Sequence, residues 1–227
     1  MIWHNYYAEI LEILEGTYKD SRSALVYGSV WQLLVAVMLS AQTNDNQVNK
    51  ITEDLFSLYP EPEDIAALSR EELESRIRTC GLYKNKAKNI LATARIVAGQ
   101  YGSLVPKERE QLQALPGVGR KTANVVLSVG YGLPALAVDT HVFRLAHRLG
   151  LSQGKNPEAV EKDLCRIIPK EKWGQAHHWL IWHGRKICQA QKPKCEICPL
   201  LGLCQGRRTE DGGQRKVERG KKSKDRS

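Results

Sequence analysis

Apolar residues recur along this chain at helical spacing, and the alternating pattern of half-buried strands is nearly absent. Residues 29–41, SVWQLLVAVMLSA, are apolar on nearly all sides, which predicts a helix buried at the centre of the fold. Ser69 and Glu72 have the spacing of a capping box and predict a helix start. Near the N-terminus, one helical face collects Tyr6, Ile10, Ile13 and Leu14. The hydrophobic pattern therefore predicts an all-α protein.

The same pattern predicts a long helix over 85–101, with Lys86 and Lys88 on its outer side. Further helices are expected to begin at Lys107, Arg120, Thr140, Pro157 and Lys172. Two glycine- and proline-containing breaks, 131–138 and 151–157, are candidate hinges between two helical lobes. The last segment, 205–227, has a single apolar residue and nine basic residues, so a disordered basic tail that strengthens non-specific DNA binding is expected there.

The formal net charge of +9 favours a polyanionic partner, such as nucleic acid. The longest apolar stretch, 33–39, is far shorter than the roughly 20 residues that a bilayer-spanning helix needs, so no membrane association is expected. The N-terminus does not have the pattern of a secretory signal, which favours an intracellular, reducing location. Six cysteines in such a compartment are more typical of metal or cluster ligands than of disulfides.

Residues 115–127, LPGVGRKTANVVL, predict a helix–hairpin–helix. Pro116 ends one helix, Gly117 and Gly119 allow a tight turn, and the next helix starts near Arg120. The backbone N–H groups around Gly117, Val118 and Gly119 can then form a nest for a DNA phosphate, which Arg120 would share. A plain turn between two helices is the alternative interpretation.

Lys121 follows directly, at the helix end where the peptide dipoles are positive. Positive surroundings favour the neutral amine, which is the form that acts as a nucleophile. In AVDTHVFR, Asp139 is placed to cap a helix and to stabilise positive charge on a substrate. Lys121 and Asp139 are a plausible pair for cleaving an N-glycosidic bond. The alternatives are a surface lysine and an aspartate that only caps its helix.

Four cysteines near the end have the spacing Cys188-x6-Cys195-x2-Cys198-x5-Cys204. Four thiolates in so short a loop are a strong signal for one metal centre, and both zinc and a cubane iron–sulfur cluster fit it. Lys192 and Lys194 lie within the loop, and Arg185 and Lys186 lie just before it; together they can form a second phosphate-facing patch or a solvated surface. Cys80 and Cys165 lie in apolar helical contexts and are expected to be buried free thiols.

Taken together, LPGVGRKTANVVL, AVDTHVFR, LLVAVMLSAQTNDNQVNK, TCGLYKNKAKNI and the four-cysteine loop resemble the endonuclease III family of base-excision DNA glycosylases. The resemblance covers nearly the whole chain up to Cys204. It implies an all-α, two-domain fold, with a six-helix barrel over residues 22–133. A second domain, residues 1–21 and 134–204, would hold a [4Fe–4S] cluster on Cys188, Cys195, Cys198 and Cys204.

The resemblance also implies roles for individual residues. Lys121 matches the lysine that forms a Schiff base, and Asp139 its partner carboxylate. Gln42 and Leu82 match residues that insert into the duplex, and Asp45 a residue beside the lesion pocket. The implied partner is double-stranded DNA with oxidised or ring-saturated pyrimidines or abasic sites, acted on by a monomer in the bacterial cytoplasm, in association with the nucleoid.

Other readings of the chain are less well supported. Adenine-mismatch and thymine-mismatch glycosylases of the same superfamily are disfavoured by Lys121, because monofunctional relatives that resemble this chain usually lack a lysine at that position. A DNA-binding module without catalytic activity is disfavoured by the presence of both Lys121 and Asp139. A zinc-stabilised helical binding protein is a further alternative. It would contain zinc, whereas the favoured interpretation expects an iron–sulfur cluster.

Overall fold

The computed structural model describes residues 2–206, and within this range every regular element is a helix. The predicted basic tail lies outside the described residues from 207 onward. The α-helices are α1 (Ile2–Tyr18), α2 (Val30–Ser40), α3 (Asp45–Leu58), α4 (Pro62–Ala66), α5 (Arg70–Arg76), α6 (Tyr83–Tyr101), α7 (Arg109–Ala114), α8 (Arg120–Val125), α9 (Thr140–Arg148), α10 (Pro157–Ile167) and α11 (Trp173–Lys186). A π-helix, η1 (Val126–Gly130), continues α8, and two 3₁₀ turns are η2 (Lys170–Lys172) and η3 (Cys195–Ile197).

Local capping chemistry explains several of the helix starts. Ser69 and Glu72 form both halves of the predicted capping box at α5, which satisfies backbone donors that a helix start leaves free. Asn156 caps α10, whose first residue is Pro157. Asp139 caps α9 by accepting from the backbone of the next turn. The predicted helix starts at Thr140 and Pro157 are confirmed, and so is the start at Arg120, which has no side-chain cap.

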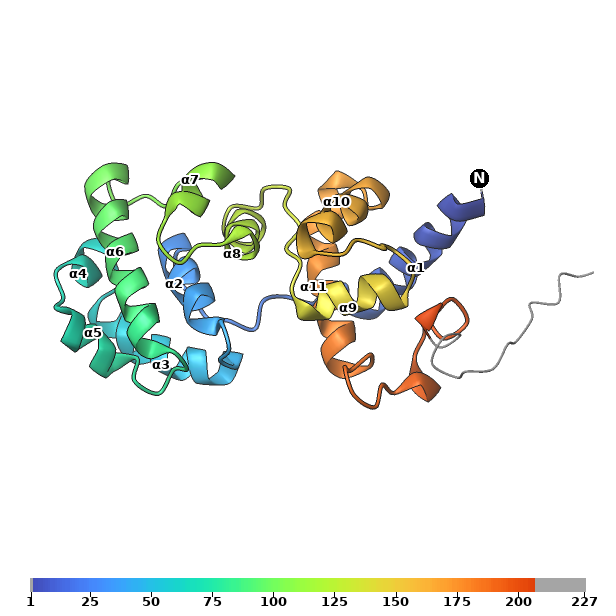
Figure 1. Cartoon of the computed structure of the whole chain (residues 1–227), viewed down its shortest axis with the longest axis horizontal. Coiled ribbons are helices and arrows are strands. Elements are labelled where there is room, and N and C mark those ends of the chain that lie inside the picture. The colour runs from blue at the N-terminus through green and yellow to red at the C-terminus, as the bar shows by residue number, and fades with distance from the viewer. Residues whose placement is uncertain (1, 207–227) are drawn as a thin grey trace, which may run out of the picture.

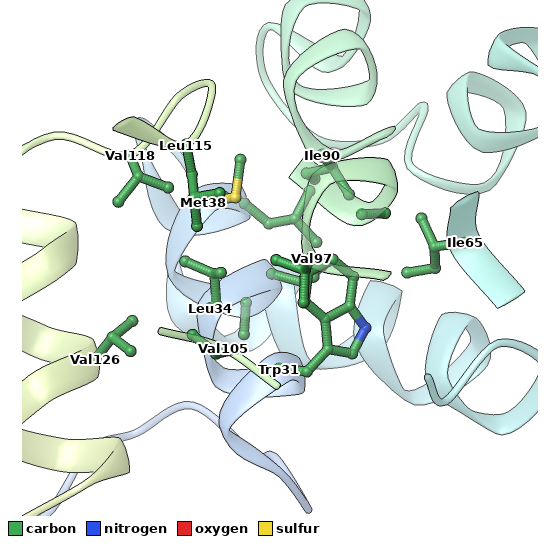
Figure 2. Packing of buried hydrophobic residues seen from close by; sticks show 14 of the residues in the cluster. Trp31, Leu34, Met38, Ile65, Ile90, Val97, Val105, Leu115, Val118 and Val126 are labelled. Carbon is green, nitrogen blue, oxygen red and sulfur yellow. The ribbon is translucent and has the colours of Figure 1, made fainter. Parts of the chain in front are cut away.

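Two hydrophobic cores lie side by side, and the view in Figure 1 separates them into two lobes. The first core is built around the apolar helix α2, which packs against α3, α6, α8 and η1. Figure 2 shows Trp31, Leu34 and Met38 of α2 among other buried residues, which include Ile65 of α4 and Ile90 of α6. The prediction that α2 is a buried helix is confirmed, because eight of its residues are buried. Removing this much apolar surface from water is the main favourable term that holds the lobe together.

The second core combines both ends of the described chain, because α1 packs against α11, and α11 packs against α9. Ile10 and Leu14 of α1 are fully buried there, on the helical face that the sequence predicts. The chain crosses to the first lobe after α1 and returns before α9 (Figure 1). A small third cluster joins the lobes through Leu33, Val37, Val125 and Ala137.

One lysine of the long helix α6 does not lie where the sequence places it. Lys88 is exposed as predicted, whereas Lys86 is buried with 7% of its surface accessible. Cys80 is buried and Cys165 is half-buried, and both are free thiols. In the described part of the chain, no helix has the length and apolar character needed to cross a membrane.

Candidate active site and DNA-facing surfaces

A cleft of about 1120 Å³ opens between the two lobes. The first lobe contributes the loop after α2, the start of α3 and the inner face of α8. The second lobe contributes the start of α9 and one face of α11. Its polar lining includes Gln42, Asp45, Lys121, Asp139, His141, His177, His178 and Arg185. Gln42, Asp45, Lys121 and Asp139, which the sequence singles out from distant segments, thus line one cavity.

Lys121 is the second residue of α8 and reaches into this cleft. Lys121 is exposed to the cleft by surface accessibility, and the protein atoms around its ammonium partly desolvate it, which lowers the pKa of Lys121. The negative charges of Asp139 and Asp45 raise its pKa, and the positive charge of Arg185 lowers it. The sequence predicts a lowered pKa from the positive helix end, whereas burial is the largest cause of the lowered pKa in the structure.

Asp139 is held in a fixed direction by its own helix. One carboxylate oxygen, Oδ1, accepts hydrogen bonds from the backbone N–H groups of His141 and Val142, both at 2.8 Å. The predicted capping role is therefore confirmed. Since Asp139 also lines the cleft and its charge acts on Lys121, capping and a second role at the site are compatible.

Two cleft residues of α11, His177 and His178, were not predicted from the sequence, and Arg185, predicted as part of a basic patch, also lines the cleft. His177 is buried and its Nδ1 lies 2.8 Å from the carbonyl oxygen of Ala137, which fits an N–H donor on that nitrogen. Burial lowers the pKa of His177 to about 4, and burial also lowers the pKa of His178. Both rings are consequently neutral at physiological pH, so they add polar lining without positive charge.

The hairpin between α7 and α8 has the predicted form, and its two glycines differ. Gly117 has a φ of +79°, and a Cβ added there would lie 2.8 Å from Asn89 of α6. Gly119 has an extended backbone and open space beside it. Within the described residues, the N–H groups of both glycines lack a backbone acceptor, as a phosphate-binding turn requires. Val118 instead buries its side chain and donates its N–H to Leu115, so it stabilises the turn.

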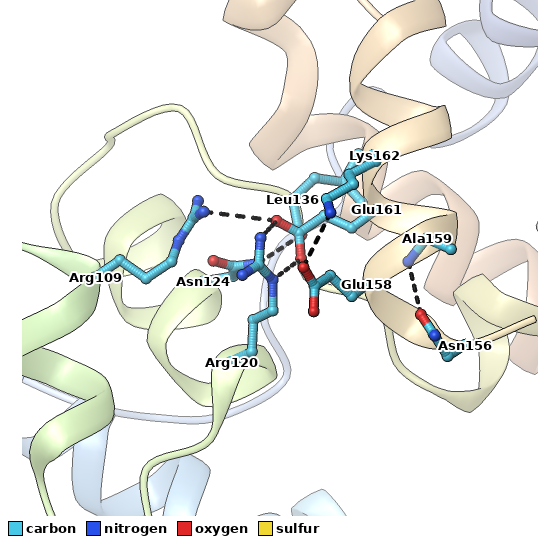
Figure 3. A network of polar contacts seen from close by, with 9 residues as sticks. All are labelled: Arg109, Arg120, Asn124, Leu136, Asn156, Glu158, Ala159, Glu161 and Lys162. Atoms are coloured by element: carbon cyan, nitrogen blue, oxygen red, sulfur yellow. Dashed lines mark hydrogen bonds and ion pairs between the residues drawn. The ribbon is translucent and has the colours of Figure 1, made fainter. Parts of the chain in front are cut away.

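Arg120 has a protein partner that the sequence argument did not foresee. Its Nε and Nη2 donate to the two carboxylate oxygens of Glu161 on α10, at 2.7 and 3.0 Å, as Figure 3 shows. Glu161 is 5% accessible and also faces Arg109 of α7 at 3.8 Å. One edge of the Arg120 guanidinium is therefore occupied, and phosphate binding by its remaining N–H groups stays a prediction.

Gln42 and Leu82, the two predicted inserting residues, share an unusual backbone conformation. Gln42 has a φ of 56° and Leu82 a φ of 58°, in the left-handed region that side chains other than glycine rarely adopt. Both are exposed, Leu82 with 59% of its surface accessible. Asp45, three residues after Gln42, forms an ion pair of 2.6 Å with Arg185 of the opposite lobe.

The four cysteines of the C-terminal loop line a second, smaller cavity with apolar walls, formed by Leu149, Ile187 and Leu201 among others. Arg148 Nη1 lies 3.4 Å from the Sγ of Cys188. Four thiols that line one cavity with apolar walls suit an iron–sulfur cluster. Lys192 and Lys194 are both exposed on the same loop.

Comparison with known proteins decides the family. Residues 35–170 match the family model described as HhH-GPD superfamily base excision DNA repair protein, and residues 188–204 match the iron-sulfur binding domain of endonuclease III. Endonuclease III of Rickettsia felis is 50% identical over 87% of this chain and 92% of its own length. The Escherichia coli K12 enzyme is 45% identical over 87% of this chain and 93% of its own length. The chain belongs to the endonuclease III family.

Solved structures agree with this family assignment. A trapped endonuclease III–DNA covalent intermediate is 46% identical and superposes with a TM-score of 0.86 over 90% of this chain and 98% of that one. A non-covalent endonuclease III–DNA complex gives a TM-score of 0.88 at 44% identity, over 92% and 99% of the two chains. The expected all-α fold of the family is confirmed. The match to the family's iron–sulfur domain also decides between zinc and a [4Fe–4S] cluster in favour of the cluster.

Proposed function

We propose that this protein removes oxidised or ring-saturated pyrimidines from double-stranded DNA and then cuts the strand at the resulting abasic site. The observation that carries the proposal is the cleft itself, in which Lys121, with its lowered pKa, and the fixed carboxylate of Asp139 face the same space. Further support comes from the trapped covalent intermediate of a relative that is 46% identical.

The proposed reaction begins when a damaged nucleotide leaves the base stack and enters the cleft. The neutral Lys121 amine attacks C1′ of the sugar, and the base departs with the electron pair of the N-glycosidic bond. Asp139 stabilises the positive charge that develops on the sugar. Ring opening gives a Schiff base between Lys121 and C1′. Loss of the C2′ proton then breaks the C3′–oxygen bond, which cuts the strand 3′ to the lesion.

The hairpin and the two left-handed turns would bind the DNA around this site. Gly117 and Gly119 offer backbone N–H groups to a phosphate, and Arg120 adds its free N–H groups. Gln42 and Leu82 are exposed and would fill the space that the extruded nucleotide leaves, with Asp45 beside the lesion. Lys192 and Lys194 would contact phosphates at the other end of the site.

The [4Fe–4S] cluster would be held by Cys188, Cys195, Cys198 and Cys204, whose thiolates suit iron. When bound, it would tie the loop 188–204 to α9 and α11, and no step of base removal passes through it. We further propose two domains, residues 22–133 and residues 1–21 with 134–204, a division supported by the two separate cores. A monomer working on the chromosome in the cytoplasm is consistent with this scheme.

Borohydride trapping tests the proposed reaction. A duplex with one abasic site is incubated with the protein and borohydride, which reduces a Schiff base to a stable covalent adduct. The wild type is expected to form the adduct and Lys121→Ala to form none. Lys170→Ala, which removes an exposed lysine from η2 outside the cleft, serves as the matched control. An adduct of wild-type yield in Lys121→Ala would refute the assignment.

A further inference from the structure

Lys86 is a buried cation that the proposed reaction does not use. It lies in the first turns of α6, on the side of the helix that faces the core. Its Nζ lies 2.8 Å from the carbonyl oxygen of Leu39, 2.5 Å from that of Ala41 and 3.1 Å from Thr43 Oγ1. A fourth neighbour, Cys80 Sγ, lies at 3.1 Å. A buried ammonium is stable only when such partners replace the water that it loses.

These partners surround one of the two left-handed turns. Ala41 and Thr43 are the residues on either side of Gln42, so the ammonium holds this turn from both sides. Leu39 contributes a carbonyl from the last turn of α2, where a helix end leaves acceptors free. The conformation of Gln42 is therefore fixed from within the protein, while its side chain remains exposed.

The backbone of the same lysine holds the second turn. The N–H of Lys86 donates to the carbonyl oxygen of Leu82 at 3.1 Å, which closes the first turn of α6. The two turns lie close together, because a Cβ added to Gly81 would lie 3.3 Å from the carbonyl oxygen of Gln42. The Lys86 ammonium thus contacts the residues on either side of Gln42 and, through Cys80 Sγ, the segment that leads into Leu82.

We propose that Lys86 is a positioning residue that sets Gln42 and Leu82 in their DNA-facing conformation before DNA arrives. Left-handed backbone at residues other than glycine persists only where the surroundings impose it. Charge-assisted hydrogen bonds are strong enough to impose it here. Turns that already have their DNA-bound conformation bind DNA more tightly, because they lose less conformational freedom on binding. This inference rests on the proposed function, since it concerns how the same site engages damaged DNA.

The test uses DNA that the protein can bind but cannot cleave. A duplex carries a tetrahydrofuran abasic analogue opposite 2-aminopurine, whose fluorescence rises when insertion into the duplex unstacks it. The readout is the rise at saturating protein, together with the dissociation constant. Lys86→Met is compared with Lys88→Met, which removes an exposed lysine from the same helix.

The wild type and Lys88→Met are expected to give a full fluorescence rise. Lys86→Met is expected to lose most of the rise and to bind about tenfold more weakly, since hydrogen bonds to a charged group are lost. A folded Lys86→Met that melts at a lower temperature but keeps the full rise would overturn the proposal, because Lys86 would then be only a structural residue.

A second pair of variants decides the matter even if Lys86→Met does not fold. Thr43→Val removes one partner of the ammonium at constant shape, and Thr43→Ser keeps the hydroxyl. The valine variant is expected to lose part of the rise and the serine variant to restore it. Equal fluorescence in the two variants would overturn the proposal. The proposed reaction is tested separately, because borohydride trapping by the wild type does not depend on this readout.

Discussion

Arg120 and Glu161 join the helix that carries Lys121 to the opposite lobe through two parallel hydrogen bonds of 2.7 and 3.0 Å. Glu161 is buried, so its carboxylate depends on Arg120 and Arg109 for charge compensation (Figure 3). The pair therefore connects α8 of the first lobe to α10 of the second lobe.

Glu161→Gln is expected to lower the free energy of unfolding by about 1–3 kcal/mol, because a charged hydrogen-bond acceptor between two arginines is lost. Urea unfolding measures this change. Glu158→Gln on the same helix removes an exposed carboxylate that pairs with Lys162, and it should unfold like the wild type. Equal stability of the two variants would show that the ion pair does not hold the lobes together.

The pH dependence of trapping should report the surroundings of Lys121. Only the neutral amine attacks, so the trapping rate rises as the pH increases through the lowered pKa of Lys121. Asp139→Asn removes a charge that raises this pKa, so the midpoint should move to lower pH even though the maximal rate falls. Arg185→Ala removes a charge that lowers it, so the midpoint should move to higher pH. Midpoints that move in the same direction would contradict this account.

The two hairpin glycines should respond differently to substitution. Gly117→Ala places a Cβ against Asn89 at positive φ and is expected to cost about 1–3 kcal/mol of stability. Gly119→Ala meets no neighbour in the protein, so the melting temperature should stay close to that of the wild type. DNA affinity should fall in both, since the added methyl of Gly119→Ala occupies space that a phosphate would use. Unchanged DNA binding by Gly119→Ala would place the phosphate elsewhere.

Local chemistry made much of the fold predictable. The helix starts at Arg120, Thr140 and Pro157 follow from a hairpin, a capping aspartate and a proline, each contained within a few residues. Asp139 was predicted as a cap for the same reason. The cysteine loop was predictable because the spacing of its four thiols is itself the signal.

Features that depend on distant partners were not predictable in this way. The sequence pattern places Lys86 on the outer side of α6, but its ammonium is buried against partners that include the carbonyls of Leu39 and Ala41, more than forty residues earlier. The partner of Arg120 is likewise 41 residues away. The lowered pKa of Lys121 was predicted in direction, but its largest cause in the structure is burial.

Asp45→Asn is expected to release Arg185 from its ion pair and to make it available to DNA. Non-specific binding should then depend more steeply on salt, by about one unit in the slope of log K against log salt. Asp54→Asn, an exposed site on the same helix, makes the same change in net charge outside the cleft lining. Identical slopes for the two variants would mean that Arg185 does not reach a phosphate. Excision of a damaged base by Asp45→Asn tests the predicted place of Asp45 beside the lesion.

The assignment of the cluster ligands can be checked by iron content. The purified protein should carry about four irons and absorb visible light. Cys198→Ser should lose iron and visible absorbance. Cys165→Ser is the matched control, since Cys165 is a half-buried free thiol outside the loop, and it should keep both. Iron retained in full by Cys198→Ser would remove this residue from the ligand set.

The packing of α1 against α11 has a consequence for the order in which the protein is made. The proposed domain over residues 22–133 is continuous in sequence, so it would leave the ribosome as one segment and could begin to fold while synthesis continues. Ile10 and Leu14 emerge first, yet they are buried by helices that are synthesised more than 120 residues later. Until α11 has been synthesised, the apolar face of α1 is expected to be exposed to water or covered by a chaperone. The iron-binding loop comes later still, so cluster insertion is expected to be among the last steps of maturation.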